Sequence, residues 1–251
     1  MTVLDGSIEL SAATRLWIER VERKYKDKPD RQFNFDTFPT IPEIAHAAIN
    51  RWELPPGSRS GDLYVLDPGA GDGVWGAAVR SRFPTAYIVG YDIRDIPRPE
   101  EYDEWHNKTD FLTVKELGNF DLVVGNPPFA IAEQFVGHSI AATTCYRPGG
   151  FSWKGEILFM LRAAFMAGFD RYEELWKPGP QCRAEVLIPR PSFTGNGISD
   201  PKTEYAVFNW QCWKERDVNT EPIVPTGFLK WRENKSRKRT TKKQLRLGLT
   251  S

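Results

Sequence analysis

Residues 62–73 decide the fold, and they read Asp-Leu-Tyr-Val-Leu-Asp-Pro-Gly-Ala-Gly-Asp-Gly. The first six, 62–67, form a short run of apolar and β-favouring side chains, which is typical of a buried strand. The glycines that follow allow a tight turn and let a ligand approach the backbone. A helical stretch then begins at Val74. A strand, a glycine-rich turn and a helix in this order predict the first unit of a parallel α/β sheet.

The same alternation continues outward from this unit. Further strands are predicted at 86–93, 110–114, 120–125 and 155–162, with helices over 130–143 and from the end of the fifth strand to about residue 176. Two last strands, 184–189 and 204–210, are joined by a loop without a helix, which indicates an antiparallel pair. We therefore expect a doubly wound, mostly parallel seven-stranded α/β sheet with a C-terminal antiparallel hairpin, a Rossmann-like fold.

The organisation of the chain follows from its periodicity and charge. Residues 8–26 have helical spacing, and a second helix is predicted from Thr40, as the first residue of a capping box with Glu43, to about Trp52. We expect an N-terminal accessory helix within 1–32, a catalytic domain at 33–229 and a basic tail at 230–251 that is disordered in isolation. The tail holds nine Lys or Arg and one acid, so the rest of the chain carries a net charge of −7.

Composition excludes several classes of protein. The 251 residues are 40% hydrophobic and 27% charged, as in globular domains. We find no secretory signal and no apolar run long enough to span a bilayer, and we expect a cytoplasmic protein that binds no membrane. Three scattered cysteines indicate a reducing compartment, and no His or Cys pair has metal-ligand spacing, so no metal is expected.

Acidic residues follow the first predicted strands and indicate the kind of ligand. Asp67 and Asp72 lie in the glycine turn, where they would repel the pyrophosphate of a dinucleotide but suit a ligand with sulfonium and ammonium groups. Asp92 closes the second strand, where it can accept hydrogen bonds from ribose hydroxyls. Asp110 belongs to the third predicted strand and can accept from an adenine amino group. An ordinary tight turn is the alternative, and it does not explain this order of acids.

Asn126-Pro127-Pro128-Phe129 follows the buried strand 120–125 and predicts the catalytic site. The prolines fix the backbone and donate no hydrogen bond, so carbonyl and amide oxygens can converge as acceptors beside an aromatic ring. Acceptors for both N–H bonds of an exocyclic amino group stabilise the positive charge that develops during methyl transfer. The alternative is a rigid turn after the strand, with a packed phenylalanine.

These motifs resemble those of class I S-adenosylmethionine-dependent methyltransferases. The Asn-Pro-Pro-Phe motif and its place after the cofactor loop resemble the gamma-type DNA adenine-N6 methyltransferases, and residues 190–210 resemble a segment of phage and prophage enzymes of that group. The resemblance covers about residues 33–232. It implies S-adenosyl-L-methionine as cofactor, a role in DNA methylation such as restriction-modification, and cofactor contacts at Phe38, Thr40, Asp67, Pro68, Gly69, Ala70, Gly71, Asp92, Ile93, Asp110 and Phe111. The segment Phe38-Pro-Thr-Ile-Pro42 departs from the family by the inserted Ile41.

Target binding is predicted at two places. The loop after residue 189 offers a cation and an aromatic ring to the nucleic acid, and its predicted contacts are Arg190, Ser192, Phe193 and Thr194. The tail offers non-specific attraction to phosphates, and its predicted contacts are Lys238, Arg239, Lys242 and Lys243. Packing of Phe193 and an ion pair of Arg190 with an acid such as Asp200 are the alternatives, and the tail could be a solubilising terminus. DNA is the expected partner, and an auxiliary protein could assist target recognition.

Three functions are compatible with these motifs. The first is adenine-N6 methylation of DNA, which requires the base to be flipped out of the duplex. The second keeps the chemistry and replaces the substrate by an RNA adenine or a protein glutamine amide. The third is a non-catalytic protein with the same fold, which need not keep all of these motifs. We expect the first.

Overall fold

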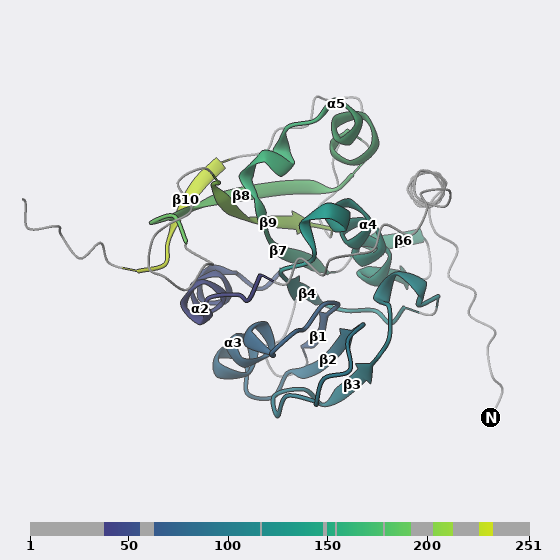
Figure 1. Cartoon of the computed structure of the whole chain (residues 1–251). Helices are drawn as coiled ribbons and strands as arrows, with labels where there is room; N and C mark the ends of the chain where they lie inside the picture. Colours follow the sequence, from purple (N-terminus) through teal and green to yellow (C-terminus); the bar gives the residue numbers. More distant parts are fainter. Residues whose placement is uncertain are drawn as a thin grey trace, which may run out of the picture.

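A computed structural model of the chain describes residues 38–55, 63–115, 117–147, 150–153, 155–177, 179–191, 203–212 and 226–232. Their centre is an eight-stranded sheet in the order β10-β8-β9-β7-β4-β1-β2-β3 (Figure 1). The strands are β1 (Tyr64–Asp67), β2 (Tyr87–Asp92), β3 (Glu104–Asn107), β4 (Leu122–Gly125), β7 (Glu156–Arg162), β8 (Gln181–Ile188), β9 (Tyr205–Gln211) and β10 (Thr226–Lys230). A separate hairpin pairs β5 (Thr144–Arg147) with β6 (Gly150–Trp153).

The sheet is doubly wound: the chain adds β2 and β3 on one side of β1 and then continues with β4 on the other side. Strand β1 pairs in parallel with β2 on one side and with β4 on the other. Strand β9 lies between β7 and β8 and is antiparallel to both. This insertion confirms the predicted antiparallel pair and distinguishes the sheet from a plain dinucleotide fold, whose strands run in the order 3-2-1-4-5-6. The remaining strand, β10, extends the sheet parallel to β8.

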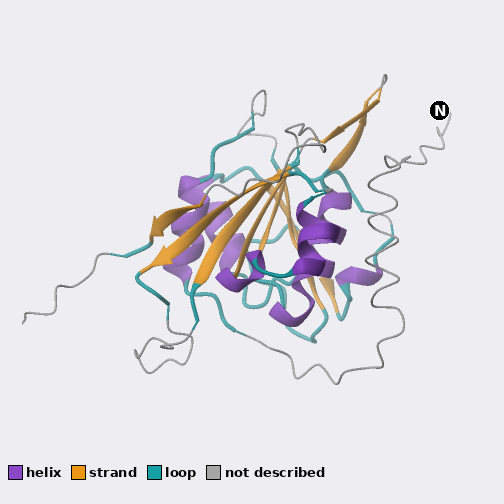
Figure 2. Cartoon of the chain, turned by 90° about the horizontal axis from the view of Figure 1, so that it is seen from above, coloured by secondary structure: helices purple, strands orange, loops and turns teal. Residues whose placement is uncertain are grey.

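Helices cover both faces of the sheet, as Figure 2 shows from above. On one face, α2 (Pro42–Arg51) and α3 (Val74–Arg82) pack on side chains such as Val65 and Ile88. On the other face, α4 (Ala132–Ala142) packs on side chains such as Leu66 and Val123. Because neighbouring residues of a strand point to opposite faces, buried strands such as β4 supply both cores. In the described part of the chain, no helix is long and apolar enough to cross a membrane.

The predicted third strand is wrong. Residues 110–114 do not join the sheet; Phe111–Thr113 form a 3-10 turn, η2, because the Asp110 carboxylate accepts from the backbone N–H of Leu112 at 3.0 Å. The third strand along the chain is instead β3, at Glu104–Asn107. None of its four residues is buried, so this polar edge strand carries no hydrophobic pattern.

Two predicted helix features also differ. Helix α2 begins at Pro42 with Ile41 as its capping residue, and no side-chain cap hydrogen bond forms, so Thr40 is not the cap. Proline in the first turn favours an extended conformation at the residue before it, which places the boundary at Ile41. The helix expected up to residue 176 is broken, because Gly168 has a φ of 144° between the 3-10 turn η4 (Ala163–Met166) and the short α5 (Phe169–Arg171). A π-helical turn, η5 (Tyr172–Trp176), follows.

Candidate active site

The two central motifs emerge side by side where the sheet reverses. Asp67 is the last residue of β1, and Asn126 directly follows β4, its parallel neighbour. The two strands point in the same direction, so both motifs lie at the carboxyl edge of the sheet (Figure 1). In open α/β sheets this reversal point is where ligands bind, because the connections on either side diverge and leave a crevice.

The glycine turn after β1 has the backbone conformation that its sequence predicts. Gly71 and Gly73 have φ values of 56° and 81°, in the left-handed region that favours glycine. A β-carbon on Gly73 would also lie 2.7 Å from the Cβ of Pro99. The turn is tied to the next strand by the Ala70 N–H, which donates to the Tyr91 carbonyl at 3.0 Å. The remaining turn residues, Pro68 and Gly69, link this structure to β1.

Asp67 is completely buried below the turn, and burial raises the pKa of its carboxyl group to about 7. The hydroxyl of Tyr102 donates to Asp67 Oδ2 at 2.8 Å and accepts from the backbone N–H of Gly76 at 3.2 Å. The second oxygen, Oδ1, has no hydrogen-bond partner within the described residues. The site therefore holds a carboxyl group poised between its two protonation states, with one oxygen still available.

Asp92 is buried at the end of β2, and its two oxygens each accept two hydrogen bonds. Oδ1 accepts from the backbone N–H of Arg94 at 2.8 Å and from the Arg94 Nε at 3.0 Å. Oδ2 accepts from the Gly71 N–H at 2.9 Å and from the second guanidinium nitrogen of Arg94 at 3.0 Å. A carboxylate has about four acceptor positions, and the Arg94 guanidinium occupies two of them, one on each oxygen.

The residues beyond β2 differ in their exposure. Ile93 is 51% exposed beside Asp92 and offers an apolar surface to a ligand. Asp110 follows Thr109, whose N–H donates to the Asp92 carbonyl, and the Asp110 carboxylate caps η2. Phe111 is buried in the core against Phe135. The cofactor-binding roles of Asp110 and Phe111 stay predictions.

The Asn126 side chain has a defined orientation. Its Nδ2 donates to the Phe38 carbonyl at 2.9 Å, and its Oδ1 is buried without a hydrogen-bond partner among the described residues. Among the described residues, no backbone N–H donates a hydrogen bond to the carbonyl oxygen of Pro127. Pro128 leads into the 3-10 turn η3 (Phe129–Ile131) and accepts from the Ile131 N–H. The hydrogen bond that the Asn126 NH₂ group donates to Phe38 therefore fixes the direction in which the amide oxygen points.

Phe129 is surrounded by other rings and by one cation. Phe38 stacks on it with the ring centroids 5.4 Å apart, and Tyr205 lies 5.7 Å away at a tilt of 43°. The guanidinium carbon of Arg162 is 5.0 Å from the ring centroid. The structure thus brings Phe38, a predicted cofactor contact, beside the predicted catalytic motif, and it adds Arg162.

The predicted nucleic-acid contacts are only partly visible. Arg190 follows β8 and forms an ion pair with Glu204, the residue before β9, whereas Asp200 lies outside the described residues. The other predicted contacts lie outside the described residues: Ser192, Phe193, Thr194, Lys238, Arg239, Lys242 and Lys243. Within the described part of the chain, no group of three or more His, Cys, Asp or Glu is arranged to hold a metal ion.

Sequence reasoning missed three residues of this site. Tyr102 and Arg94 lie in a loop that has no periodicity, and their partners are set by tertiary structure. Arg162 did leave a signal, since it is a single charge in an otherwise apolar run that ends a buried strand.

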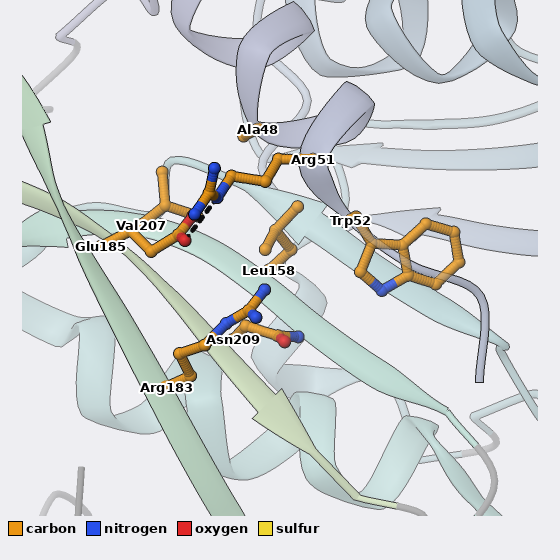
Figure 3. A pocket seen from close by; sticks show the side chains of 8 residues that line it. All are labelled: Ala48, Arg51, Trp52, Leu158, Arg183, Glu185, Val207 and Asn209. Atoms are coloured by element: carbon orange, nitrogen blue, oxygen red, sulfur yellow. Dashed lines mark hydrogen bonds and ion pairs between the residues drawn. The ribbon is translucent and has the colours of Figure 1, made fainter. Parts of the chain in front are cut away.

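A small cavity lies elsewhere, under α2, and Figure 3 shows its lining. Its volume is about 10 Å³, which is close to the minimum for one water molecule and far below the size of a nucleoside. The lining includes the ion pair of Arg51 with Glu185 but none of the predicted site residues. This cavity is therefore too small to hold a nucleoside.

The residues at this edge fit S-adenosylmethionine. Asp67 Oδ1 is an orphaned acceptor next to Gly125, where a β-carbon would lie 3.3 Å from that oxygen. Gly71 allows close approach, and Ile93 offers an apolar contact beside Asp92. The fit requires one change, because the guanidinium of Arg94 must leave the Asp92 carboxylate before a ribose can bind there.

No family model matches the chain, whereas solved structures similar to it are found. A type I restriction-modification system methyltransferase subunit from Streptococcus thermophilus matches with a TM-score of 0.52 and 17% identity, over 73% of this chain and 47% of that one. A modification subunit of a putative type I restriction enzyme from Vibrio vulnificus has a TM-score of 0.49 and 14% identity, over 88% and 52%. A putative class I S-adenosylmethionine-dependent methyltransferase from Listeria monocytogenes has a TM-score of 0.48 and 13% identity, over 90% and 77%.

The Streptococcus match and the strand order show the fold. The chain has the Rossmann-like fold of this methyltransferase subunit, with eight strands in the main sheet rather than the seven predicted. It spans about half the length of the two restriction-enzyme subunits.

Proposed function

We propose that this chain transfers a methyl group from S-adenosylmethionine to the exocyclic N6 amino group of an adenine in DNA. The observation that carries the proposal is the buried Asn126 Oδ1, which lacks a hydrogen-bond partner among the described residues while Nδ2 of the same amide is occupied. A buried acceptor without a partner costs stability, so such a group is expected where a ligand supplies the donor.

The orientation of Asn126 suits an amino-group substrate. The bond from Nδ2 to the Phe38 carbonyl prevents the amide from presenting its donor end to the site. The Asn126 Oδ1 and the Pro127 carbonyl can then each accept one N–H bond of the target –NH₂ group. As the nitrogen becomes tetrahedral and positive, both hydrogen bonds strengthen, which lowers the barrier. This arrangement needs no strong general base before transfer.

The residues of the glycine turn suit a cationic nucleoside. The bound cofactor supplies an electrophilic methyl group on a sulfonium. Asp67 provides a carboxylate near the methionine end, Asp92 can accept from the ribose hydroxyls, and Ile93 can pack on the adenine ring. An anionic dinucleotide is disfavoured here, because its pyrophosphate would approach the buried Asp67 rather than a neutral turn.

The aromatic lining supports a planar target. Phe129 lies directly after the acceptors, so a flipped base that stacks on it would bring its amino group to Asn126. The restriction-modification role named for the Streptococcus thermophilus subunit supports DNA as the substrate.

The test is methyl transfer from labelled S-adenosylmethionine to unmethylated double-stranded DNA, with the nucleosides resolved after digestion. We expect N6-methyladenine with the wild type. Asn126→Ala should lose at least a hundredfold in turnover and keep its cofactor affinity, as when a preorganised oxyanion-type contact is removed. Asn119→Ala is the matched control, because Asn119 is exposed in the loop before β4.

Three results would contradict the proposal. Turnover retained by Asn126→Ala would remove the acceptor from the mechanism. A methylated cytosine would change the target base. Incorporation into RNA or a protein amide, with none into DNA, would change the substrate class.

A further inference from the structure

Arg162 occupies a position at the entrance of the candidate site. It is the last residue of β7, which pairs with β4 in the register Gly125 to Phe159, so β7 ends on the same edge as the catalytic motif. On its other side Arg162 pairs with Tyr205, the first residue of β9, whose ring contacts Phe129. The strand geometry therefore holds this arginine beside the ring on which the target base would stack.

The charge of Arg162 is not compensated by the residues around it. The side chain is exposed, and within the described part of the chain it forms no ion pair. Its contact there is the face of Phe129, with the guanidinium carbon 5.0 Å from the ring centroid. Arg190 provides a contrast on the same edge, because its guanidinium is held by Glu204.

We infer that Arg162 is a nucleic-acid contact, whose guanidinium lies over Phe129 in the free protein and moves to a phosphate next to the target base when that base stacks on the ring. This inference rests on the proposed function and names a further residue that binds its substrate. The planar guanidinium is suited to both positions, because it stacks on aromatic faces and binds phosphate oxygens with two parallel hydrogen bonds.

The contacts of Phe129 indicate which neighbour gives way to the base. Phe38 is attached to the site through its backbone, since its carbonyl accepts from Asn126 Nδ2 at 2.9 Å. A shift of the Phe38 backbone would therefore disturb the catalytic amide. Arg162 has a long, exposed side chain, and an exposed cation–π contact is weak. Releasing the guanidinium opens the ring and leaves the Asn126 amide in place.

The charge of the chain without its basic tail makes a cation at this position consequential. Residues 1–229 carry a net charge of −7, which repels a polyanion. A phosphate near the catalytic motif needs a local positive charge to offset that repulsion. Arg162 supplies such a charge on the rigid end of a central strand, where it can also fix the position of the DNA relative to Asn126.

The experiment compares Arg162→Ala with wild type in DNA binding and in turnover. Binding of a mixed-sequence duplex is measured from low to moderate salt, with S-adenosylhomocysteine present so that no methyl transfer occurs. We expect about tenfold weaker binding and a salt slope smaller by about 0.9, the value for one lost phosphate contact on duplex DNA. The KM for DNA should rise, and the affinity for S-adenosylhomocysteine should stay at the wild-type value.

Two further variants separate the phosphate contact from other effects. Arg162→Lys keeps the charge, so it should recover the salt slope, though with weaker binding than arginine. Arg98→Ala is the charge-matched control, because Arg98 is exposed on the loop before β3 and its contact to the Asp103 carbonyl is long, at 3.4 Å. It should leave the KM for DNA unchanged.

An unchanged salt slope in Arg162→Ala overturns the inference. A lower melting temperature or weaker cofactor binding with wild-type DNA affinity also overturns it, because Arg162 would then only support the Phe129 ring. Failure of the proposed function is recognised separately, since it is decided by wild-type turnover, whereas this inference is decided by binding without a methyl donor.

Discussion

Replacing Arg94 with alanine should tighten cofactor binding, which is an unusual direction for a substitution in a binding site. The wild-type guanidinium occupies one acceptor position on each oxygen of Asp92. The Gly71 and Arg94 backbone N–H groups occupy the other two, and they remain in the variant. Arg94→Ala therefore opens one position on each oxygen, which is what a ribose diol requires.

The magnitude follows from the exposure of the pair. Asp92 is only 6% exposed in its side chain, but Arg94 is 31% exposed, so solvent weakens the attraction and rehydrates the guanidinium when it leaves. A fully exposed pair contributes about 0–1 kcal/mol, and a hydrogen bond to a charged group about 1.5–3 kcal/mol. We take about 1–2 kcal/mol for this two-point contact, which corresponds to cofactor binding about 5- to 30-fold tighter in the variant.

Calorimetric titration with two ligands tests the cause of the gain. S-adenosylmethionine carries a sulfonium charge and S-adenosylhomocysteine does not, but both carry the same ribose. Equal gains for both ligands would show that a ribose position was opened, whereas a gain for S-adenosylmethionine alone would reflect the removal of a repelling charge. In the Asp92→Ala background the Arg94 substitution should have no further effect. Unchanged or weaker binding of both ligands by Arg94→Ala would refute the reasoning.

Two further predictions concern Asp67 and its neighbours. Burial raises the Asp67 pKa to about 7 in the folded protein, above its value of about 4 in the unfolded chain. Between about pH 4 and pH 7 the folded protein therefore binds a proton at Asp67 that the unfolded chain has lost. The free energy of unfolding falls as pH rises through this range, by at most about 1.4 kcal/mol per pH unit. Asp67→Asn should therefore flatten the dependence of the urea unfolding free energy on pH between 5 and 8, and an equally steep curve in the variant would assign the slope to another group. Gly76→Ala places a β-carbon 2.6 Å from the Tyr102 ring, which must shift away from Asp67. We expect a loss of about 1–3 kcal/mol in urea unfolding, and wild-type stability would mean that the ring moves freely.

The parts of the fold that were predictable are those buried on both faces. Strands β1, β2, β4 and β7 are runs of apolar residues with few exposed positions, so their pattern is visible in the sequence. Edge strands lack that pattern. Strand β10 has one buried residue in five, Leu229, and it was predicted as the end of the domain rather than as a strand.

The site was predictable wherever a residue follows directly from its strand. Asp67, Asp92 and Asn126 each stand at or just beyond a strand end, and parallel pairing brings such ends together. Their partners were not predictable, because Tyr102 reaches Asp67 across 35 residues and Phe38 reaches Asn126 across 88. A pattern in the sequence reports which face a residue occupies, but not which distant loop will cover it.

The two oxygens without hydrogen-bond partners on adjacent strands explain how one edge can serve two ligands. Asp67 Oδ1 and Asn126 Oδ1 are both buried acceptors that the described residues leave unpaired, one beyond β1 and one beyond β4. An acidic acceptor suits a cationic donor, and a neutral amide oxygen suits an amino group that must become positive only during reaction. If the acceptor beyond β4 were negatively charged as well, it would favour a cation rather than a neutral adenine. Under the proposed function, this difference in charge between the neighbouring acceptors places the cofactor beyond β1 and the target beyond β4, which orders the two reactants along the sheet.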